Sequence, residues 1–357
     1  MDDLLHWIAL ARIRGLGRDQ KARLLELWGS PAAVFEHATP RFEHAWGVEA
    51  LPVLEGGPDL EAAARELDLV RRLGLGILIR GRPGFPRALE EMPDAPLLLY
   101  ARGSLPEGPA LAMVGSRRPS SRSRHLARAL AAELASDGVV IVSGLAYGID
   151  AACHEGALSA GGQTVTVLAS GLERARPVGN RGLARRILAS GGAWLSEYPP
   201  GQQYQQHHYP ERNRLISGLA RATLVVEARE RSGSLVTAKH ALAQGRGLGA
   251  VPGPVDSDLC RGSNRLLRDA APILDADDLR VLAGVVALPK ETRPTGAGEA
   301  SEGHAQRVLA ALADGPLGLD DLVRRLELPA DRLAGVLLEL ELAGRIAREG
   351  ARVVLER

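Results

Sequence analysis

Basic and small hydroxyl residues gather at three places where an apolar, strand-like stretch is followed by a helical pattern. The first is the run 117–128, which has no acidic residue and holds Arg117, Arg118, Arg122, Arg124 and Arg128. The second is Arg212-Asn213-Arg214, and the third is Ser232-Gly233-Ser234. Free N–H groups at a helix start, hydroxyls and arginine forks all bind phosphate oxygens. These segments therefore indicate an anion site.

Each segment also has an explanation that needs no ligand. Arg122, Arg124 and Arg128 suit a solvated helix face, whereas Arg117 lies directly at a strand end and favours the anion role. The second segment could form surface ion pairs with Glu211, and the serines of the third could simply cap a helix.

Candidates for catalysis are few. Asp150 and His154 are four residues apart, so on a helix they share a face and could form an acid–base pair, but a buried structural hydrogen bond explains this spacing as well. Glu197, at a strand end, could be a base or an ion-pair partner of an arginine. The adjacent His207 and His208 favour a surface loop and have no partner at metal-ligand spacing. We therefore expect no catalytic residue and no metal site.

The residues after the first two strands argue against common nucleotide cofactors. The segment 115–120, GSRRPS, is not G-x-G-x-x-G, and the second strand ends at Ser143 rather than at an acidic residue. A nicotinamide dinucleotide would thus lack its glycine turn and its ribose acceptor. The sequence contains no G-x-x-x-x-G-K-[ST] motif, so a P-loop ATPase is disfavoured too, and we expect no cofactor.

Composition indicates a globular protein with a positively charged middle. The 357 residues suffice for two or three domains, with 45% hydrophobic and 24% charged residues. The net charge of +1 divides into −3 over residues 1–112 (13 basic, 16 acidic), +6 over 113–282 (21 and 15) and −2 over 283–357 (10 and 12). The middle segment is therefore the part expected to meet an anion. With two cysteines, no apolar run of about 18 residues and no basic signal-peptide start, we expect a cytoplasmic protein without a membrane span.

Hydrophobic spacing predicts four parts. Residues 1–74 favour short helices, with a Gly15-Leu16-Gly17 turn that could bind phosphate but more simply ends a helix. Residues 75–282 predict an α/β domain: short strands over 75–108, then six apolar strands alternating with helices over the core 110–282, which is typical of a parallel sheet covered on both faces. Ligands bind at the carboxyl ends of such strands.

The remaining parts are a linker and a small module. Residues 283–300 are rich in Pro, Gly and Ala, which is typical of a linker, and residues 301–357 predict three helices and a hairpin turning at Glu349-Gly350, the pattern of a winged helix. Its third helix carries Glu339 and Glu341 against Arg332, so repulsion from phosphates disfavours DNA reading and favours protein contact.

Together these segments resemble the DNA-processing protein A (DprA/Smf) family. The matching motifs follow the family's order over most of 110–270: VGSR (114–117), SGLAYGIDAACHEGAL (143–158), SEYPPG (196–201), YPERNRLISGL (209–219), RSGSLVTAKHAL (231–242), AVPG (250–253) and GSNRLL (262–267). The resemblance implies an extended Rossmann-like core, a helical SAM-like or helix-hairpin-helix-like N-terminal domain and a C-terminal winged helix. It also implies a homodimer through that core, which binds single-stranded DNA without known enzymatic turnover. In the family this protects incoming DNA during natural transformation and loads a RecA-type recombinase onto it.

The resemblance also assigns the expected DNA contacts. It places the family's DNA-contacting arginine on Arg117 and the surrounding pocket on Gly115, Ser116, Ser143, Gly144, Leu145, Ser170, Gly171, Arg212, Asn213 and Arg214. The loop 176–180, RPVGN, departs from the family's usual Tyr-Pro and then Asn, and Arg181, Arg185 or Arg186 could supply the basic residue usual nearby. Ser232, Gly233 and Ser234 join the expected site as a phosphate-binding helix start.

Base contacts are expected to be limited, because the chain has 3 Phe, 4 Trp and 5 Tyr. Tyr198, Tyr204 and Tyr209 lie near the expected pocket and could each stack a base. Two other classes stay open. Rossmann-like nucleotide hydrolases carry PGGxGTxxE, whereas residues 231–237 here lack the paired glycines and the Glu. A regulator reading duplex DNA through the winged helix is disfavoured by the acidic third helix.

Overall fold

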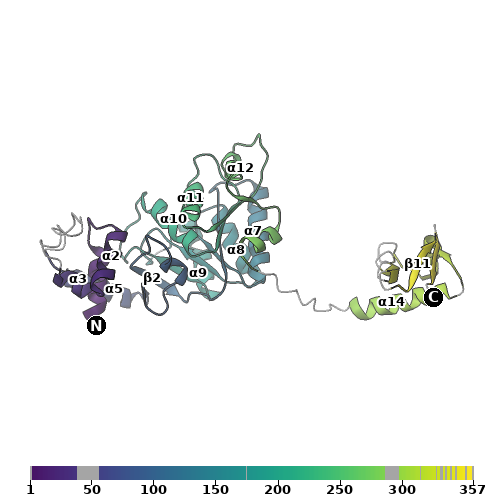
Figure 1. The fold of residues 1–357 in the computed structure, drawn as a ribbon, viewed down its shortest axis with the longest axis horizontal. Coiled ribbons are helices and arrows are strands. Elements are labelled where there is room, and N and C mark those ends of the chain that lie inside the picture. Colours follow the sequence, from purple (N-terminus) through teal and green to yellow (C-terminus); the bar gives the residue numbers. More distant parts are fainter. Residues whose placement is uncertain are drawn as a thin grey trace. The chain divides into compact units, whose positions relative to one another are not determined.

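The computed structural model describes residues 2–37, 56–173, 175–285 and 297–313, and residues 315–355 except 327, 330–332, 334–335, 338–339, 342–343 and 350–351. The chain forms two compact units, residues 1–288 and 289–357, which we describe separately (Figure 1).

The larger unit is built on a nine-stranded sheet with the order β1-β2-β6-β5-β4-β3-β7-β8-β9. Its parallel centre consists of β3 (Ala110–Val114), β4 (Val140–Ser143), β5 (Thr164–Val167), β6 (Ala193–Ser196), β7 (Ala222–Val225) and β8 (Gly247–Ala250). These six strands confirm the predicted parallel sheet. From β3 the chain winds to β6 on one side and then crosses to β7 and β8 on the other. The carboxyl end of β3 is therefore the topological switch point, where open α/β sheets bind ligands.

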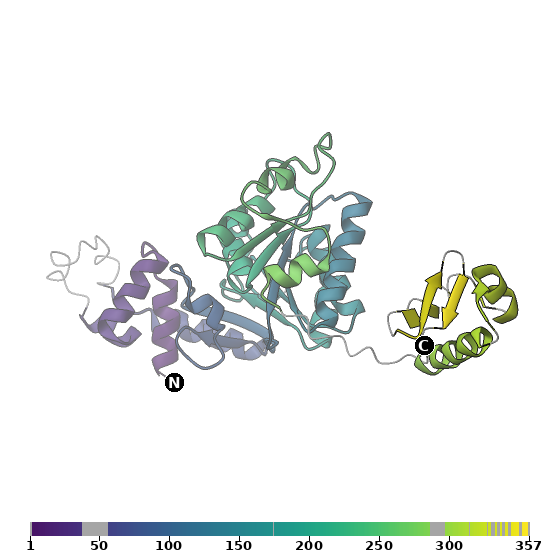
Figure 2. The same cartoon turned by 45° about the vertical axis from the view of Figure 1, so that its right-hand side comes forward.

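Helices cover both faces of this sheet, as the alternating pattern predicted. They are α7 (Ser121–Ser136), α8 (Ile149–Ser159), α9 (Arg181–Ala189), α10 (His208–Gly218), α11 (Ser234–Ala243), α12 (Arg261–Leu266) and α13 (Ala276–Leu282). One core joins α7, α8 and α13 to Met113 and Ile141, and another joins α10 and α11 to Val114 and Val142 on the opposite face. In Figure 2 the two groups lie on either side of the strands.

Two further strands extend the sheet beyond the parallel centre. β1 (Gly76–Ile79) and β2 (Leu98–Gly103) form an antiparallel pair, and β2 pairs antiparallel with β6. They lie within the segment for which the sequence predicted short strands, but their place in the main sheet was not predicted. The short helix α6 (Arg87–Glu90) lies between them, and β9 (Ala271–Pro272) adds a parallel edge beside β8. The sequence did not predict α6, α12 or β9, which are too short to show a hydrophobic period.

The N-terminal helices belong to the same compact unit as the sheet. They are α1 (Asp2–Arg12), α2 (Arg18–Trp28), α3 (Pro31–His37) and α5 (Leu60–Arg72). Their apolar faces form one core with Ile79 and Leu98 of the added strands. In the turn between α1 and α2, Gly15 has a φ of 90°, and the Lys21 Nζ donates to the carbonyls of Ala11 and Ile13 at 2.9 and 2.8 Å. These contacts agree with a turn that ends one helix and begins the next.

The smaller unit contains α14 (Ala297–Leu312), α15 (Leu319–Leu326) and a three-stranded sheet with the order β10-β12-β11. The strands are β10 (Leu317–Gly318), β11 (Ile346–Glu349) and β12 (Arg352–Leu355), and the last two form the predicted hairpin. The helix α14 begins at Ala297, within the segment 283–300 that composition predicted to be linker. Arg332, Glu339 and Gly350, which entered the sequence-based interpretation, lie outside the described residues. Among the described residues, no helix is long and apolar enough to cross a membrane.

The close contact between α7 and α8 gives a test of this packing. A Cβ on Gly156 would overlap the Arg128 carbonyl oxygen and lie 3.0 Å from the Ala131 Cβ. We expect Gly156→Ala to lower the free energy of unfolding by about 1–3 kcal/mol, as overpacking does. Gly182→Ala in α9, where nothing lies within 4 Å of the added atom, is the matched control and should change it little. The denaturant midpoints of the two variants measure their stabilities, and equal midpoints would contradict the packing described.

Candidate functional site

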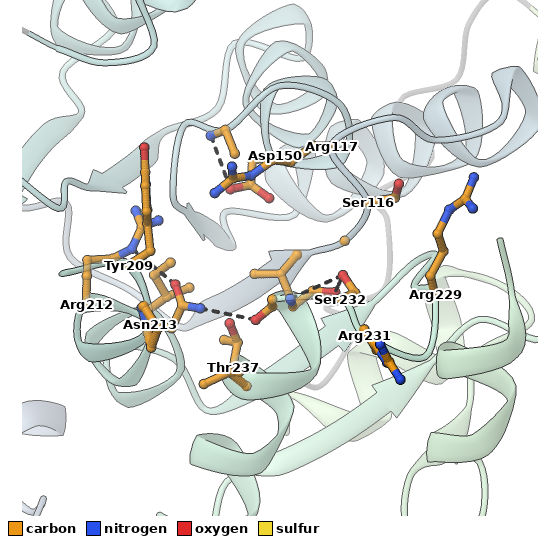
Figure 3. Close-up of a pocket in the computed structure, with 18 of the residues that line it drawn as sticks. Ser116, Arg117, Asp150, Tyr209, Arg212, Asn213, Arg229, Arg231, Ser232 and Thr237 are labelled. Atoms are coloured by element: carbon orange, nitrogen blue, oxygen red, sulfur yellow. Dashed lines mark hydrogen bonds between the residues drawn. The ribbon is translucent and has the colours of Figure 1, made fainter. Parts of the chain in front are cut away.

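A cavity of about 470 Å³ opens at the carboxyl ends of the parallel strands, at the switch point beside β3. Four segments form it: the β3–α7 loop, the start of α8, the first half of α10 and the β7–α11 loop (Figure 3). They include all three segments that the sequence singled out. The fold thus brings together residues separated by more than 100 positions in the chain.

The β3–α7 loop begins with a glycine that has no room for a side chain. A Cβ on Gly115 would lie 2.7 Å from Ile149 and 3.0 Å from the Glu227 carbonyl oxygen. The Ser116 N–H donates to that same carbonyl at 2.7 Å, and its hydroxyl accepts the Arg118 N–H at 3.1 Å. These contacts hold the loop against β7, so that Arg117 projects to the surface at the mouth of the cavity.

The guanidinium of Arg117 lies 4.9 Å from the ring centroid of Tyr209, a cation–π distance. Both residues line the cavity, together with Arg118, Arg229 and Arg231. The ion pairs formed by described residues include none of these four arginines. All four are exposed. The cavity is therefore surrounded by cations that form no ion pair with a described carboxylate, although Arg117 lies close enough to Asp150 to interact with its charge.

The N-terminus of α7 does not offer the open anion site that the sequence suggested. Ser120 is the N-cap, as expected, and its hydroxyl accepts the Ser123 N–H. The fully buried Glu227 accepts hydrogen bonds from the Ser120 N–H at 3.2 Å and the Ser120 Oγ at 2.7 Å. The protein's own carboxylate thus occupies the position that a phosphate would take at this helix start. Glu227 follows β7 directly, so its place at a strand end was the signal that could have identified it.

Arg212 forms the inner wall of the cavity. Its side chain is buried at 4% exposure, and Nη1 donates to the Gly144 carbonyl at 2.9 Å and to the Val167 carbonyl. Its guanidinium also lies 5.8 Å from the Tyr209 ring centroid. The predicted helix over 211–220 begins earlier, at His208, so Arg212 lies inside α10 rather than opening it. Arg212 therefore joins α10 to the ends of β4 and β5.

Asp150 is a buried carboxyl in the same cavity. Its Oδ2 accepts the Ala146 N–H at 3.2 Å, which fixes the β4–α8 loop. Burial raises the pKa of Asp150, while the positive charge of Arg212 opposes this rise. Asp150 does not pair with His154, the predicted acid–base partner. His154 is fully buried and bonds Thr164 Oγ1 at 2.6 Å, and burial lowers its pKa to about 3. The four-residue spacing therefore has no catalytic meaning here, because Asp150 and His154 each make a separate structural contact, to the Ala146 N–H and to Thr164 Oγ1.

The β7–α11 loop closes the opposite wall. The hydroxyls of Ser232 and Ser234 lie 2.7 Å apart, and Asn213 Nδ2 donates to the Gly233 carbonyl at 3.2 Å. Asn213 thus links α10 to the start of α11. The exposed Arg229 and Arg231 lie on this loop and belong to the cavity, although the sequence did not single them out.

A smaller depression adjoins the cavity and shares Tyr209 and Arg212 with it. Gly144, Ser170, Arg176 and Tyr204 complete its lining. The rings of Tyr204 and Tyr209 lie 5.0 Å apart at an angle of 55°, and Tyr204 is 39% exposed. The tyrosines therefore form an aromatic bridge between the two hollows.

Other expected site residues lie outside both hollows. The buried Ser143 donates to the Met113 carbonyl at 2.6 Å, and Leu145 is fully buried with a φ of 64°. The Gly171 N–H donates to the Gln202 carbonyl at 3.3 Å, and Arg181 Nε donates to the Ala175 carbonyl at 3.2 Å. In the structure these residues shape the loops around the hollows.

Arg214 and His208 also differ from expectation, whereas His207 is exposed as predicted. Arg214 is 2% exposed and pairs with Glu197 and with Asp94, at 3.2 Å to the latter. Glu197 is thus an arginine partner, one of its two predicted roles. His208 is buried against Tyr198, with ring centroids 4.0 Å apart, and is not a surface residue as predicted for the pair 207–208. Among the described residues, no group of three or more His, Cys, Asp or Glu could hold a metal ion.

The fold and the cavity define a Rossmann-like protein with a basic site at its switch point. Residues 76–282 match the family model of the DNA recombination-mediator protein A, and residues 292–352 match that of the DprA winged helix domain. The chain belongs to this DprA/Smf family of DNA-processing proteins. The match covers more than half of the chain and confirms both the family resemblance and the winged helix.

Relatives and solved structures agree with this membership. A putative DNA processing protein DprA from Mycobacterium tuberculosis is 40% identical over 72% of this chain and 70% of its own length. The X-ray structure of DNA processing protein A from Streptococcus pneumoniae matches with a TM-score of 0.66 and 29% identity, over 78% of this chain and 97% of that one. DNA processing protein A from Helicobacter pylori, solved for its single-stranded DNA binding mode, matches with a TM-score of 0.51 and 30% identity, over 57% of this chain and 93% of that one.

The buried carboxyl in a basic cavity predicts a pH dependence of anion binding. Because the pKa of Asp150 is raised, lowering the pH neutralises it before ordinary carboxyls, and affinity for a phosphate-bearing ligand should rise. Asp150→Asn should bind more tightly wherever the wild-type carboxyl is ionised and should lose this part of the pH profile. A charge about 8 Å away contributes about 0.5–2 kcal/mol at effective dielectrics of 80 to 20, or roughly 2- to 30-fold.

Titrating a thymidine oligonucleotide from pH 5 to pH 8 checks this, with Asp68→Asn on α5 as the control for loss of an exposed charge. Parallel profiles for the wild type and Asp150→Asn would show that Asp150 does not act on the ligand.

Proposed function

We propose that this protein binds single-stranded DNA in the cavity beside β3, protects incoming DNA during natural transformation and loads a RecA-type recombinase onto it. The observation that carries the proposal is the unpaired Arg117 at the cavity mouth, 4.9 Å from the Tyr209 ring. A guanidinium beside an aromatic ring offers a phosphate contact and a stacking surface at one place. Single-strand binding proteins combine these two features.

Most of the contacts that we assign are to the sugar–phosphate backbone of the DNA. In the cavity they are Gly115, Ser116, Arg117, Tyr209, Arg212, Asn213, Ser232, Gly233 and Ser234, and in the adjoining depression Gly144 and Ser170. Ser143, Leu145, Gly171, Arg181 and Arg214, which were also expected at the site, support its loops instead. Cationic contacts to phosphates carry no sequence information, so binding should depend strongly on salt and little on sequence.

The shape of the site favours a single strand over a duplex. Its volume of about 470 Å³ is in the range of small-ligand pockets, so it fits a nucleotide that has left the base stack. Tyr204 and Tyr209 then offer ring faces on which a freed base can stack. In a duplex, pairing and stacking hold the bases away from these rings.

The remaining roles follow from family membership. The matched family is named for recombination mediation, which supports recombinase loading as the outcome of single-strand binding. We place DNA binding and homodimer formation in residues 75–282, with 1–74 and 301–357 as flanking domains. We propose no catalytic turnover, because Asp150 holds a loop and His154 is enclosed in the core.

Fluorescence anisotropy with a labelled poly-dT oligonucleotide, a duplex of the same length and two salt concentrations tests the proposal. Tight, salt-sensitive, single-strand-selective binding is the expected result. Duplex preference would contradict it and favour the winged helix as the DNA reader. Absence of binding to both would favour a small-nucleotide ligand, to be screened with nucleoside monophosphates.

Arg117→Ala should weaken single-strand binding for every sequence alike, because the contact it removes is to phosphate. We expect about a tenfold loss or more, since a charged hydrogen bond contributes about 1.5–3 kcal/mol. The side chain is exposed and its cation–π contact with Tyr209 contributes only about 0.5–1 kcal/mol, so the melting temperature should fall by a few degrees at most. Arg23→Ala, an exposed arginine of α2, is the matched control. Unchanged affinity in folded Arg117→Ala protein would remove Arg117 from the site.

A further inference from the structure

The outer surface of the first turns of α7 carries a cluster of arginines that the cavity does not use. Arg122, Arg124 and Arg128 are exposed, and we call them the α7 basic face. None belongs to an ion pair of the described residues. The next acid along the helix, Glu133, pairs with Arg280 at 2.9 Å.

The α7 basic face costs helix stability in two ways. The helix has no acidic residue in its first turn, so its cations stand at the positive end of the helix dipole. Arg124 and Arg128 are also four residues apart, where like charges repel. Glu227 offsets part of the dipole at the N-cap, but its hydrogen bonds are to Ser120 rather than to any of these arginines. A bound polyanion would relieve both effects.

This face is continuous with the cavity mouth. Arg117 and Arg118 line the cavity, and α7 begins three residues later at Ser121. A helix rises about 1.5 Å per residue, so Arg128 lies roughly 10 Å along α7 from its start. Arg122 lies close enough to Cys260 to affect its pKa, which places this arginine on the flank of α7 toward α12. A chain leaving the cavity past Arg118 therefore meets further cations along α7.

We propose that the α7 basic face is a second contact surface for the same DNA strand, along which the backbone continues after leaving the cavity. The inference rests on the proposed function and specifies the path of the strand. Among its guanidiniums the face exposes His125 but no large aliphatic side chain, so it fits phosphates rather than an apolar protein surface. Contacts to successive phosphates make binding depend on strand length.

The test compares the dinucleotide dT2, which is short enough to stay at the cavity, with dT30. We expect the variant Arg122→Ala/Arg124→Ala/Arg128→Ala to bind dT2 like the wild type but dT30 more weakly. For single strands the slope of log K against log salt is about 0.7 per neutralised phosphate, so removing one phosphate contact weakens binding about fivefold at 0.1 M salt. If the variant removes two or three such contacts, dT30 affinity should fall roughly 25- to 100-fold and the slope by about 1.4 to 2.

Arg23→Ala/Arg65→Ala/Arg72→Ala, on α2 and α5, is the control, because it removes the same charge from exposed arginines of the N-terminal helices. Alanine favours helix and the substitutions remove the repulsion along α7, so the α7 variant should melt at or above the wild-type temperature. Equal dT30 affinity and salt slope in the α7 variant and the wild type would overturn the inference and leave the cavity proposal standing. An equal loss for dT2 and dT30 would overturn it as well, because the face would then act on the cavity rather than along the strand. Failure of the wild type to bind either oligonucleotide would overturn the proposed function, and this inference with it.

Discussion

The buried guanidinium of Arg212 is the contact on which the geometry of the site depends. It binds carbonyls at the ends of two neighbouring strands, those of Gly144 and Val167. A Cβ on Gly144 would overlap the guanidinium, so the glycine there is a packing requirement. Because Arg212 belongs to α10, the same contact fixes the helix that presents Tyr209 and Asn213 to the cavity. Without this cation, the ends of β4 and β5 would lose the hydrogen bonds that they share with α10.

Charge is sorted by depth around this anchor. The inner cations have partners, since Arg212 lies near Asp150 and Arg214 pairs with Glu197. The positive end of the α7 dipole has one as well, because Glu227 accepts hydrogen bonds at that helix start. The outer arginines of the described residues around the mouth, such as Arg117 and Arg231, form no ion pair. Buried charge without a partner is costly, whereas exposed charge is not. The protein can therefore keep its uncompensated positive charge only at the surface, where a ligand reaches it.

The sequence predicted the six-strand centre and the location of the site, because apolar strands and small or basic residues at their ends leave local signals. The separation of Arg117 from Arg214 was not predictable, since both are arginines near strand ends and only packing decides which is exposed. His208 was assigned to the surface because its burial comes from a ring contact with Tyr198, which no local pattern encodes. The sequence analysis did not identify Glu227, because an acid at an otherwise basic site is a poor ligand for phosphate. Its role is to accept hydrogen bonds from Ser120 of the β3–α7 loop.

The N-terminal helices contribute to the site through a network at its far side. Arg18 of α2 binds Glu197 at 2.8 Å and Glu211 at 3.4 Å, and Glu197 binds Arg214 of α10. Burial opposes the charge of Arg18, but these carboxylates outweigh it and raise the pKa of Arg18, so this guanidinium stays charged. Since Glu211 and Arg214 flank Arg212 on the same helix, α2 holds α10 from outside while the strand ends hold it from inside. The position of Tyr209 thus depends on both the helical segment and the sheet, which gives a structural reason for their forming one compact unit.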